Sequence, residues 1–259
     1  MKFVTNNLPY CALTIGHKDK YIEEKVNLKF LGIQTGNHLN WKNHIDQIIP
    51  KLSAACCVVR QMCYICNNDT LRSIYFAYFH SVASYVIIFW GNSSISKKIF
   101  TLQKRIIRIM VGAHHRTSCR RLSKKLDFLT VPSQYIYSLM SFFIGNQENF
   151  QTNLSVHNNT RNKHHLHKPI ANLSCFQKGA SYSGIRIFNS LPRSITCLKN
   201  EKTQFKVALK KIFKCTLLLL CGWIFHMYRW HVLLTVWLCK CLSYTVVFLF
   251  VCMFMTCCT

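Results

Sequence analysis

Lys29-Phe30-Leu31-Gly32-Ile33 is the stretch that decides the fold, and in it a glycine stands between two large apolar residues. It ends a run of β-branched and aromatic side chains, residues 26–33, which predicts a strand. Gly36-Asn37-His38 then predicts a turn, and a helix is expected from about Asn43. A glycine within a strand lets another backbone approach closely, or marks a bulge in an ordinary buried strand.

Beyond residue 42, apolar residues recur at steps of three and four, which predicts helices. The first helical run contains Pro50, which is expected to kink it. Its predicted buried residues are Ile45, Ile48, Leu52, Cys56, Val59 and Cys63. The polar residues 67–70 are suited to cap a second helix. The predicted buried side of that helix is Leu71, Ile74, Tyr78, Val82 and Tyr85.

Helical patterns continue over about residues 96–111, 118–126, 131–145 and 202–213. Their predicted buried residues are Ile99, Leu102, Ile106 and Ile109 in the first; Ile136, Leu139, Met140 and Phe143 in the third; and Phe205, Leu209 and Ile212 in the last. Residues 146–184 are rich in Asn, His and Lys and predict an irregular basic loop region. A short strand is expected over residues 185–190.

The chain has a large excess of positive charge. Its 259 residues hold 33 Lys and Arg against 8 Asp and Glu, a formal net charge of +25. Such an excess favours binding to a polyanion, either a nucleic acid or an anionic membrane surface.

The shortage of acidic residues restricts the chemistry. Two-metal phosphoryl transfer needs several carboxylates that converge on Mg²⁺. The eight acidic residues are scattered and contain no Asp-Asp pair: Asp19, Glu23, Glu24, Asp46, Asp69, Asp127, Glu148 and Glu201. No catalytic residue is therefore predicted, and polymerase activity is not expected of this chain alone.

Neither the cysteines nor the histidines predict a metal site. Of the 15 cysteines, only Cys63 and Cys66 have ligand spacing within the first 200 residues, and no second pair completes a four-ligand set. Cys56, Cys57, Cys63 and Cys66 instead predict a buried helical stripe of reduced thiols. His157, His164, His165 and His167 lack nearby carboxylates, which favours a basic loop over a zinc site.

The strongest candidate binding site is the segment from residue 97 to residue 125, which holds ten basic residues and no acid. On a helix these charges would face away from the apolar stripe, towards solvent or towards phosphates. The predicted nucleic-acid-binding residues are Lys97, Lys98, Lys104, Arg105, Arg108, Arg116, Arg120, Arg121, Lys124 and Lys125.

Several motifs resemble, in order and spacing, the reverse transcriptases of jockey-like non-LTR retrotransposons. They are residues 2–4, 15–16, 21–24, 29–33, 45–52, 85–91, 102–109, 159–161, 182–184 and 188–192, and together they cover about residues 1–212. In that family a Phe-Leu-Gly hairpin beyond the catalytic aspartates grips the primer end. The chain departs from the family at Gly36, where an aspartate is usual, and after Lys214.

The resemblance implies that the chain is the primer-grip and thumb part of an RNA-directed DNA polymerase, truncated before residue 1. Phe30, Leu31, Gly32 and Ile33 would be the primer-grip-like residues. The fold would be mainly α, with a small N-terminal β-hairpin, a thumb-like helical bundle and an irregular basic segment. The hydrophobic tail, which lies outside the resemblance, is expected to be helical. The partner would be an RNA–DNA hybrid or other nucleic acid, bound without sequence preference. No small-molecule substrate and no cofactor are expected, since Mg²⁺ would belong to the intact parent enzyme.

The composition changes again at residue 215. Expected domains are residues 1–42 (β-hairpins), 43–145 (helical thumb), 146–214 (basic loops and a terminal helix) and 215–259 (hydrophobic tail). The uncharged segment 242–258 is close to the length of a membrane-spanning helix. The tail is thus a membrane anchor, a buried hairpin or a translated extension from outside the element's frame. A basic protein anchored by a C-terminal transmembrane helix is the alternative function. Localisation follows the tail: the membrane if it inserts, the cytoplasm or nucleus if it does not.

Overall fold

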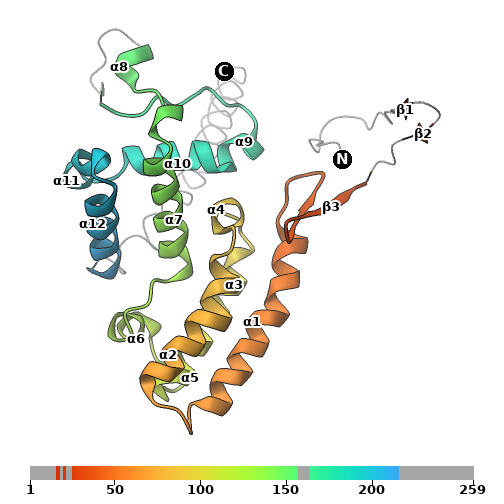
Figure 1. Cartoon of the computed structure of the whole chain (residues 1–259), viewed down its shortest axis with the longest axis vertical. Coiled ribbons are helices and arrows are strands. Elements are labelled where there is room, and N and C mark those ends of the chain that lie inside the picture. Colours follow the sequence, from red (N-terminus) through yellow and green to blue (C-terminus); the bar gives the residue numbers. More distant parts are fainter. Residues whose placement is uncertain (1–15, 18–19, 22–24, 157–163, 216–259) are drawn as a thin grey trace, which may run out of the picture. The chain divides into compact units, whose positions relative to one another are not determined.

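The computed structural model describes residues 16–17, 20–21, 25–156 and 164–215. The helices from residue 42 onward belong to one compact unit that ends at Cys215. They follow short antiparallel hairpins, so the expected fold class, mainly α after an N-terminal β-hairpin, is confirmed (Figure 1). The hydrophobic tail, including residues 242–258, lies outside the described residues. Within the described ranges, no helix combines the length and the apolar character needed to cross a membrane.

Two short hairpins come first. β1 (Gly16–His17) pairs with β2 (Lys20–Tyr21), and β3 (Asn27–Phe30) pairs with β4 (Ile33–Gly36). The single strand expected over residues 26–33 is therefore wrong, because the chain reverses at Leu31 and Gly32. Both residues have positive φ, 47° and 78°, as the commonest two-residue hairpin turn requires. Glycine adopts this conformation without strain, and the Tyr85 hydroxyl donates a hydrogen bond to the Leu31 carbonyl at 2.5 Å.

α1 (Lys42–Met62) begins one residue before the expected start. Five of the six residues predicted on its apolar face are buried, and only Cys63, beyond the end of the helix, is half-buried. Pro50 lies inside the helix, with its ring exposed, and the helix continues past it. The predicted cysteine stripe is partly wrong. Cys56 is buried, but Cys57 is exposed and Cys63 and Cys66 are half-buried.

The next helical segment is continuous over three elements: α2 (Asn68–Ile74), the π-helical η1 (Tyr75–His80) and α3 (Ser81–Ser84). The Asn67 side chain caps it by accepting the Thr70 N–H at 2.9 Å, as expected. The predicted buried side is wrong beyond Leu71. The buried residues are Leu71, Tyr75, Phe79 and Ala83, spaced by four throughout, while Tyr78 and Tyr85 are exposed. The π-helical turn explains this difference. It holds nearly one residue more than an α-helical turn, so later residues point to a different side than the α-helical spacing predicts.

Four more helices follow, and two of them, α5 and α6, carry most of the predicted basic residues. α4 (Ile87–Trp90) follows a break at Val86, which has φ 51°. α5 (Ser96–Val111) packs along α1, and α6 (Cys119–Lys125) packs on α5. α7 (Val131–Gly145) begins at Val131, followed by Pro132 as expected, and it buries all four of its predicted core residues.

The remaining elements are mostly short: η2 (Gln147–Asn149), α8 (Asn153–Val156), α9 (Ser174–Lys178), α10 (Ala180–Asn189), α11 (Arg193–Thr196), η3 (Cys197–Asn200) and α12 (Lys202–Cys215). The strand expected over 185–190 is wrong, because residues 185–189 belong to α10 and Ser190 is its C-cap. Gly184 allows α10 to lie directly on the ring of Phe143 in α7. In α12, Phe205 and Leu209 are buried as predicted. The third buried position is Phe213, and Ile212 is half-buried.

Candidate nucleic-acid interface

α5 has two opposite faces. Its buried face is formed by Ile99, Gln103, Ile106, Ile107 and Met110. The basic residues recur on the other side at helical spacing, because residues three, four and seven apart share a face. Lys97, Lys98 and Arg105 are exposed, whereas Lys104 and Arg108 are half-buried. The structure therefore brings the five predicted basic residues of this helix together on one face.

Lys98, Lys104 and Arg108 also make contacts inside the protein. Lys98 Nζ lies 3.4 Å from the Asp46 carboxylate of α1, an exposed ion pair of the kind that contributes at most about 1 kcal/mol. Lys104 Nζ lies 4.2 Å from the ring centroid of Phe100. The half-buried Arg108 donates from Nε to the Thr117 carbonyl at 2.9 Å. Arg108 thus holds the connection to α6 against α5.

α6 presents its basic residues outward. Cys119 and Ser123, one turn apart, are buried against α5, and the Cys119 thiol lies 3.3 Å from the Lys104 carbonyl. Burial raises the pKa of Cys119, although the charges of Arg108 and Lys104 oppose this shift. The other predicted binding residues on this helix and its approach are all exposed: Arg116, Arg120, Arg121, Lys124 and Lys125. α6 therefore adds a second basic surface next to the end of α5.

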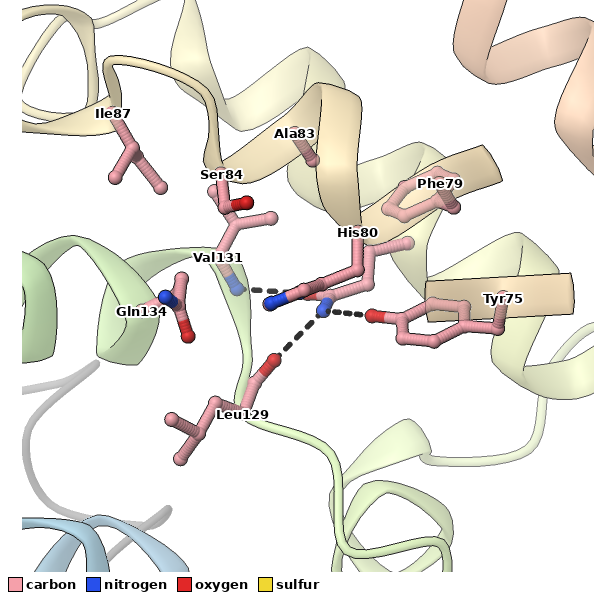
Figure 2. Close-up of a pocket in the computed structure, with 10 residues that line it drawn as sticks. Tyr75, Phe79, His80, Ala83, Ser84, Ile87, Leu129, Val131 and Gln134 are labelled. Atoms are coloured by element: carbon pink, nitrogen blue, oxygen red, sulfur yellow. Dashed lines mark hydrogen bonds between the residues drawn. The ribbon is translucent and has the colours of Figure 1, made fainter. Parts of the chain in front are cut away.

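A buried glutamine fixes α5 to the start of α7. Gln103 is 2% exposed. Its Nε2 donates to the Tyr75 hydroxyl at 3.0 Å and to the Leu129 carbonyl at 2.8 Å. The Val131 N–H donates to its Oε1 at 2.8 Å (Figure 2). Burial raises the pKa of Tyr75 to about 12, although its hydrogen bond with Gln103 works in the opposite direction.

The glutamine clamp borders a cavity of about 10 Å³, enough for roughly one water molecule. His80 and Gln134 line this cavity with apolar neighbours from α3, α4 and α7 (Figure 2). So small a volume leaves no room for a substrate. Sequence reasoning missed Gln103 by placing Leu102 on the buried face. A signal was present, because Gln103 lies four residues after Ile99 and three before Ile106.

The primer-grip-like residues lie at the tip of the β3–β4 hairpin. Phe30 is 63% exposed and Leu31 73% exposed, while Gly32 forms the turn and Ile33 is half-buried. β4 packs on α1, near the end where Asp46 pairs with Lys98. α6 comes after the opposite end of α5. The structure thus places the hairpin near the beginning of the α5 basic face and does not bring it to α6.

Within the residues that the structure describes, no group of three or more His, Cys, Asp or Glu side chains could hold a metal ion; His157 lies outside them. The carboxylates of Asp46 and Asp127 lie instead beside Lys98 and Arg72, at 3.4 and 3.7 Å. The described residues therefore do not fit the Mg²⁺ that the resemblance implies for the parent polymerase.

Comparisons with known proteins give no relative. No family model matches the chain, and no curated protein or solved structure matches it. The candidate interface is thus defined by the charge and packing of α5 and α6.

Proposed function

We propose that the chain is a non-catalytic, nucleic-acid-binding part of an RNA-directed DNA polymerase from a mobile element. It holds an RNA–DNA hybrid, or another duplex, through the basic faces of α5 and α6. The observation that supports this proposal is ten basic residues with no acid between them in the sequence. Nine of them lie on the outward sides of two packed helices, and Arg116 lies in the connection between these helices. The resemblance of residues 1–212 to retrotransposon polymerases supplies the kind of ligand.

The geometry suits phosphates better than bases. Eight of the ten basic side chains are exposed, and Lys104 and Arg108 are half-buried. Lysine and arginine on such a surface neutralise phosphates and release counterions, which gives affinity without sequence preference. Cys119 contacts the Lys104 carbonyl and Arg108 bonds to the Thr117 carbonyl just before α6, and these contacts set the spacing of the two charged surfaces. A duplex has a regular phosphate spacing, so a fixed charged surface favours it over a flexible strand.

The test compares two variants of the full-length chain that lose the same charge. In the first, four basic residues of α6 become glutamine: Arg120, Arg121, Lys124 and Lys125. In the second, four exposed lysines of α12 become glutamine: Lys202, Lys206, Lys210 and Lys211. Both helices keep their buried faces, so neither variant should lose its fold.

We expect the α6 variant to bind a labelled RNA–DNA hybrid at least about tenfold more weakly than the α12 variant. Equal losses would mean that net charge alone governs binding, and the proposed interface would be wrong. Vesicles with anionic headgroups serve as the competing ligand. If they bind more tightly than the hybrid at the same salt concentration, the basic faces are a membrane surface instead.

A further inference from the structure

The β3–β4 hairpin has its apolar side turned outward. Val26, Leu28 and Phe30 alternate along the chain and therefore share one face, and they are 60%, 44% and 63% exposed. Leu31 at the turn extends this apolar surface. The opposite face is the one that meets α1: Asn27 accepts a hydrogen bond from the Asn43 side chain at 3.0 Å. Contiguous exposed apolar surface of this kind marks an interaction site.

Among the residues that the structure describes, the outer edge of β3 is also open. Phe30 faces Ile33 and Leu28 faces Thr35, and the Asn37 N–H bonds to the Val26 carbonyl at 3.0 Å. In an antiparallel pair, the residues between hydrogen-bonded pairs point their backbone groups away from the partner strand. For β3 these residues are Asn27 and Lys29. On β4, the Gln34 N–H likewise points away from the partner strand, and it faces the His44 side chain of α1 at 3.5 Å. In the described part of the chain no strand pairs with the outer edge of β3.

We infer that this edge and face bind an extended segment of another polypeptide, in which apolar and acidic residues alternate. An added strand would receive backbone hydrogen bonds from Asn27 and Lys29. Its side chains on one face would cover Leu28 and Phe30, and those on the other would lie beside Lys29, which is exposed. Cross-strand neighbours of opposite charge are favourable, so the second set is acidic.

The charge of the chain argues against a second copy as the occupant. With 33 basic and 8 acidic residues, two copies repel each other. The occupant is therefore a different polypeptide.

The test uses the full-length chain and a labelled octapeptide of alternating Val and Glu. We expect binding by fluorescence anisotropy, with protection of the Asn27 and Lys29 amides from hydrogen exchange. Methylating the peptide nitrogens on one edge should abolish binding, whereas methylating those on the other edge should not. A Val-Lys peptide should bind at least about tenfold more weakly.

Variants locate the site. Phe30→Ser and Leu28→Ser should each weaken peptide binding at least about tenfold and leave Tm unchanged, because both side chains are exposed. Tyr64→Ser, at an 87% exposed position in the α1–α2 turn, is the matched control and should bind as the parent does. The α6 glutamine variant should also retain the peptide, which excludes attraction to the basic faces.

Four results would overturn the inference: no peptide binding, binding that Phe30→Ser leaves intact, self-association that Phe30→Ser abolishes, or hybrid binding that depends on Phe30. The third would assign the face to a second copy. The fourth would assign it to nucleic acid, the ligand that the resemblance implies for Phe30 and from which this inference departs.

Discussion

Replacing Gln103 by alanine tests whether the buried glutamine holds α5 in place. The substitution removes three hydrogen bonds, at 2.8–3.0 Å, and leaves the buried Val131 N–H without its acceptor. An unsatisfied buried donor costs about 1–3 kcal/mol, and each remaining hydrogen bond contributes about 1 kcal/mol. We therefore expect a loss of about 3–5 kcal/mol in the free energy of unfolding. For a unit of this size that corresponds to a fall in Tm of about 6–20 °C.

The assay is urea denaturation followed by far-ultraviolet circular dichroism. Gln134→Ala is the matched control: this glutamine borders the same cavity, but its Nε2 donates only to Ser138 of its own helix, at 3.2 Å. It should change stability by no more than about 0.5 kcal/mol.

A second variant, Gln103→Glu, keeps the shape of the side chain but places a carboxylate opposite the Leu129 carbonyl. Burial raises the pKa of such a group, so its stability deficit should shrink as the pH falls and the carboxyl group becomes a donor. If Gln103→Ala loses less than about 1 kcal/mol, or no more than Gln134→Ala, the clamp does not hold the helix.

Further predictions concern packing, proton binding and the backbone. Gly184→Ala should destabilise by about 1–3 kcal/mol, because its methyl group would overlap the ring of Phe143. Gly145→Ala, with open space around it, should be neutral. If urea titrations show the same loss of stability for both variants, the close contact between Gly184 and Phe143 is wrong. Burial lowers the pKa of His80 from 6.5, so the unfolded state binds its proton more readily and stability falls as the pH drops below about 6.5. His80→Gln should reduce this loss of stability between about pH 7 and pH 5. If the free energy of unfolding depends on pH as steeply in His80→Gln as in the parent, this role of His80 is wrong. Pro50→Ala should raise Tm, because it restores a helix hydrogen bond, and a lower Tm would show that the proline contributes to packing.

Regular periodicity made much of the helical fold predictable from the sequence. The buried residues of α1 and α7 follow the spacing of three and four that an undistorted helix requires. Asn67 could be predicted as an N-cap because its short polar side chain precedes an apolar helical run. The basic residues of α5 share one face for the same reason.

The errors arose where the backbone leaves its regular form. The hairpin turn required Leu31 to adopt a positive φ, which few sequences would suggest. The π-helical turn between Tyr75 and His80 changed which aromatic residues are buried. α10 depends on the contact between Gly184 and Phe143, and Gln103 depends on backbone groups near residue 130. These long-range contacts are invisible to local pattern analysis.

The salt dependence of hybrid binding by the full-length chain tests the central claim most directly. If α5 and α6 together neutralise about five phosphates, the logarithm of the association constant should fall linearly with the logarithm of the salt concentration, with a slope of about −4.5. The α6 glutamine variant should show a shallower slope, because its remaining contacts come from α5. Affinity that stays flat as ionic strength rises, or a slope unchanged in that variant, would contradict the assignment of a nucleic-acid interface to these two helices.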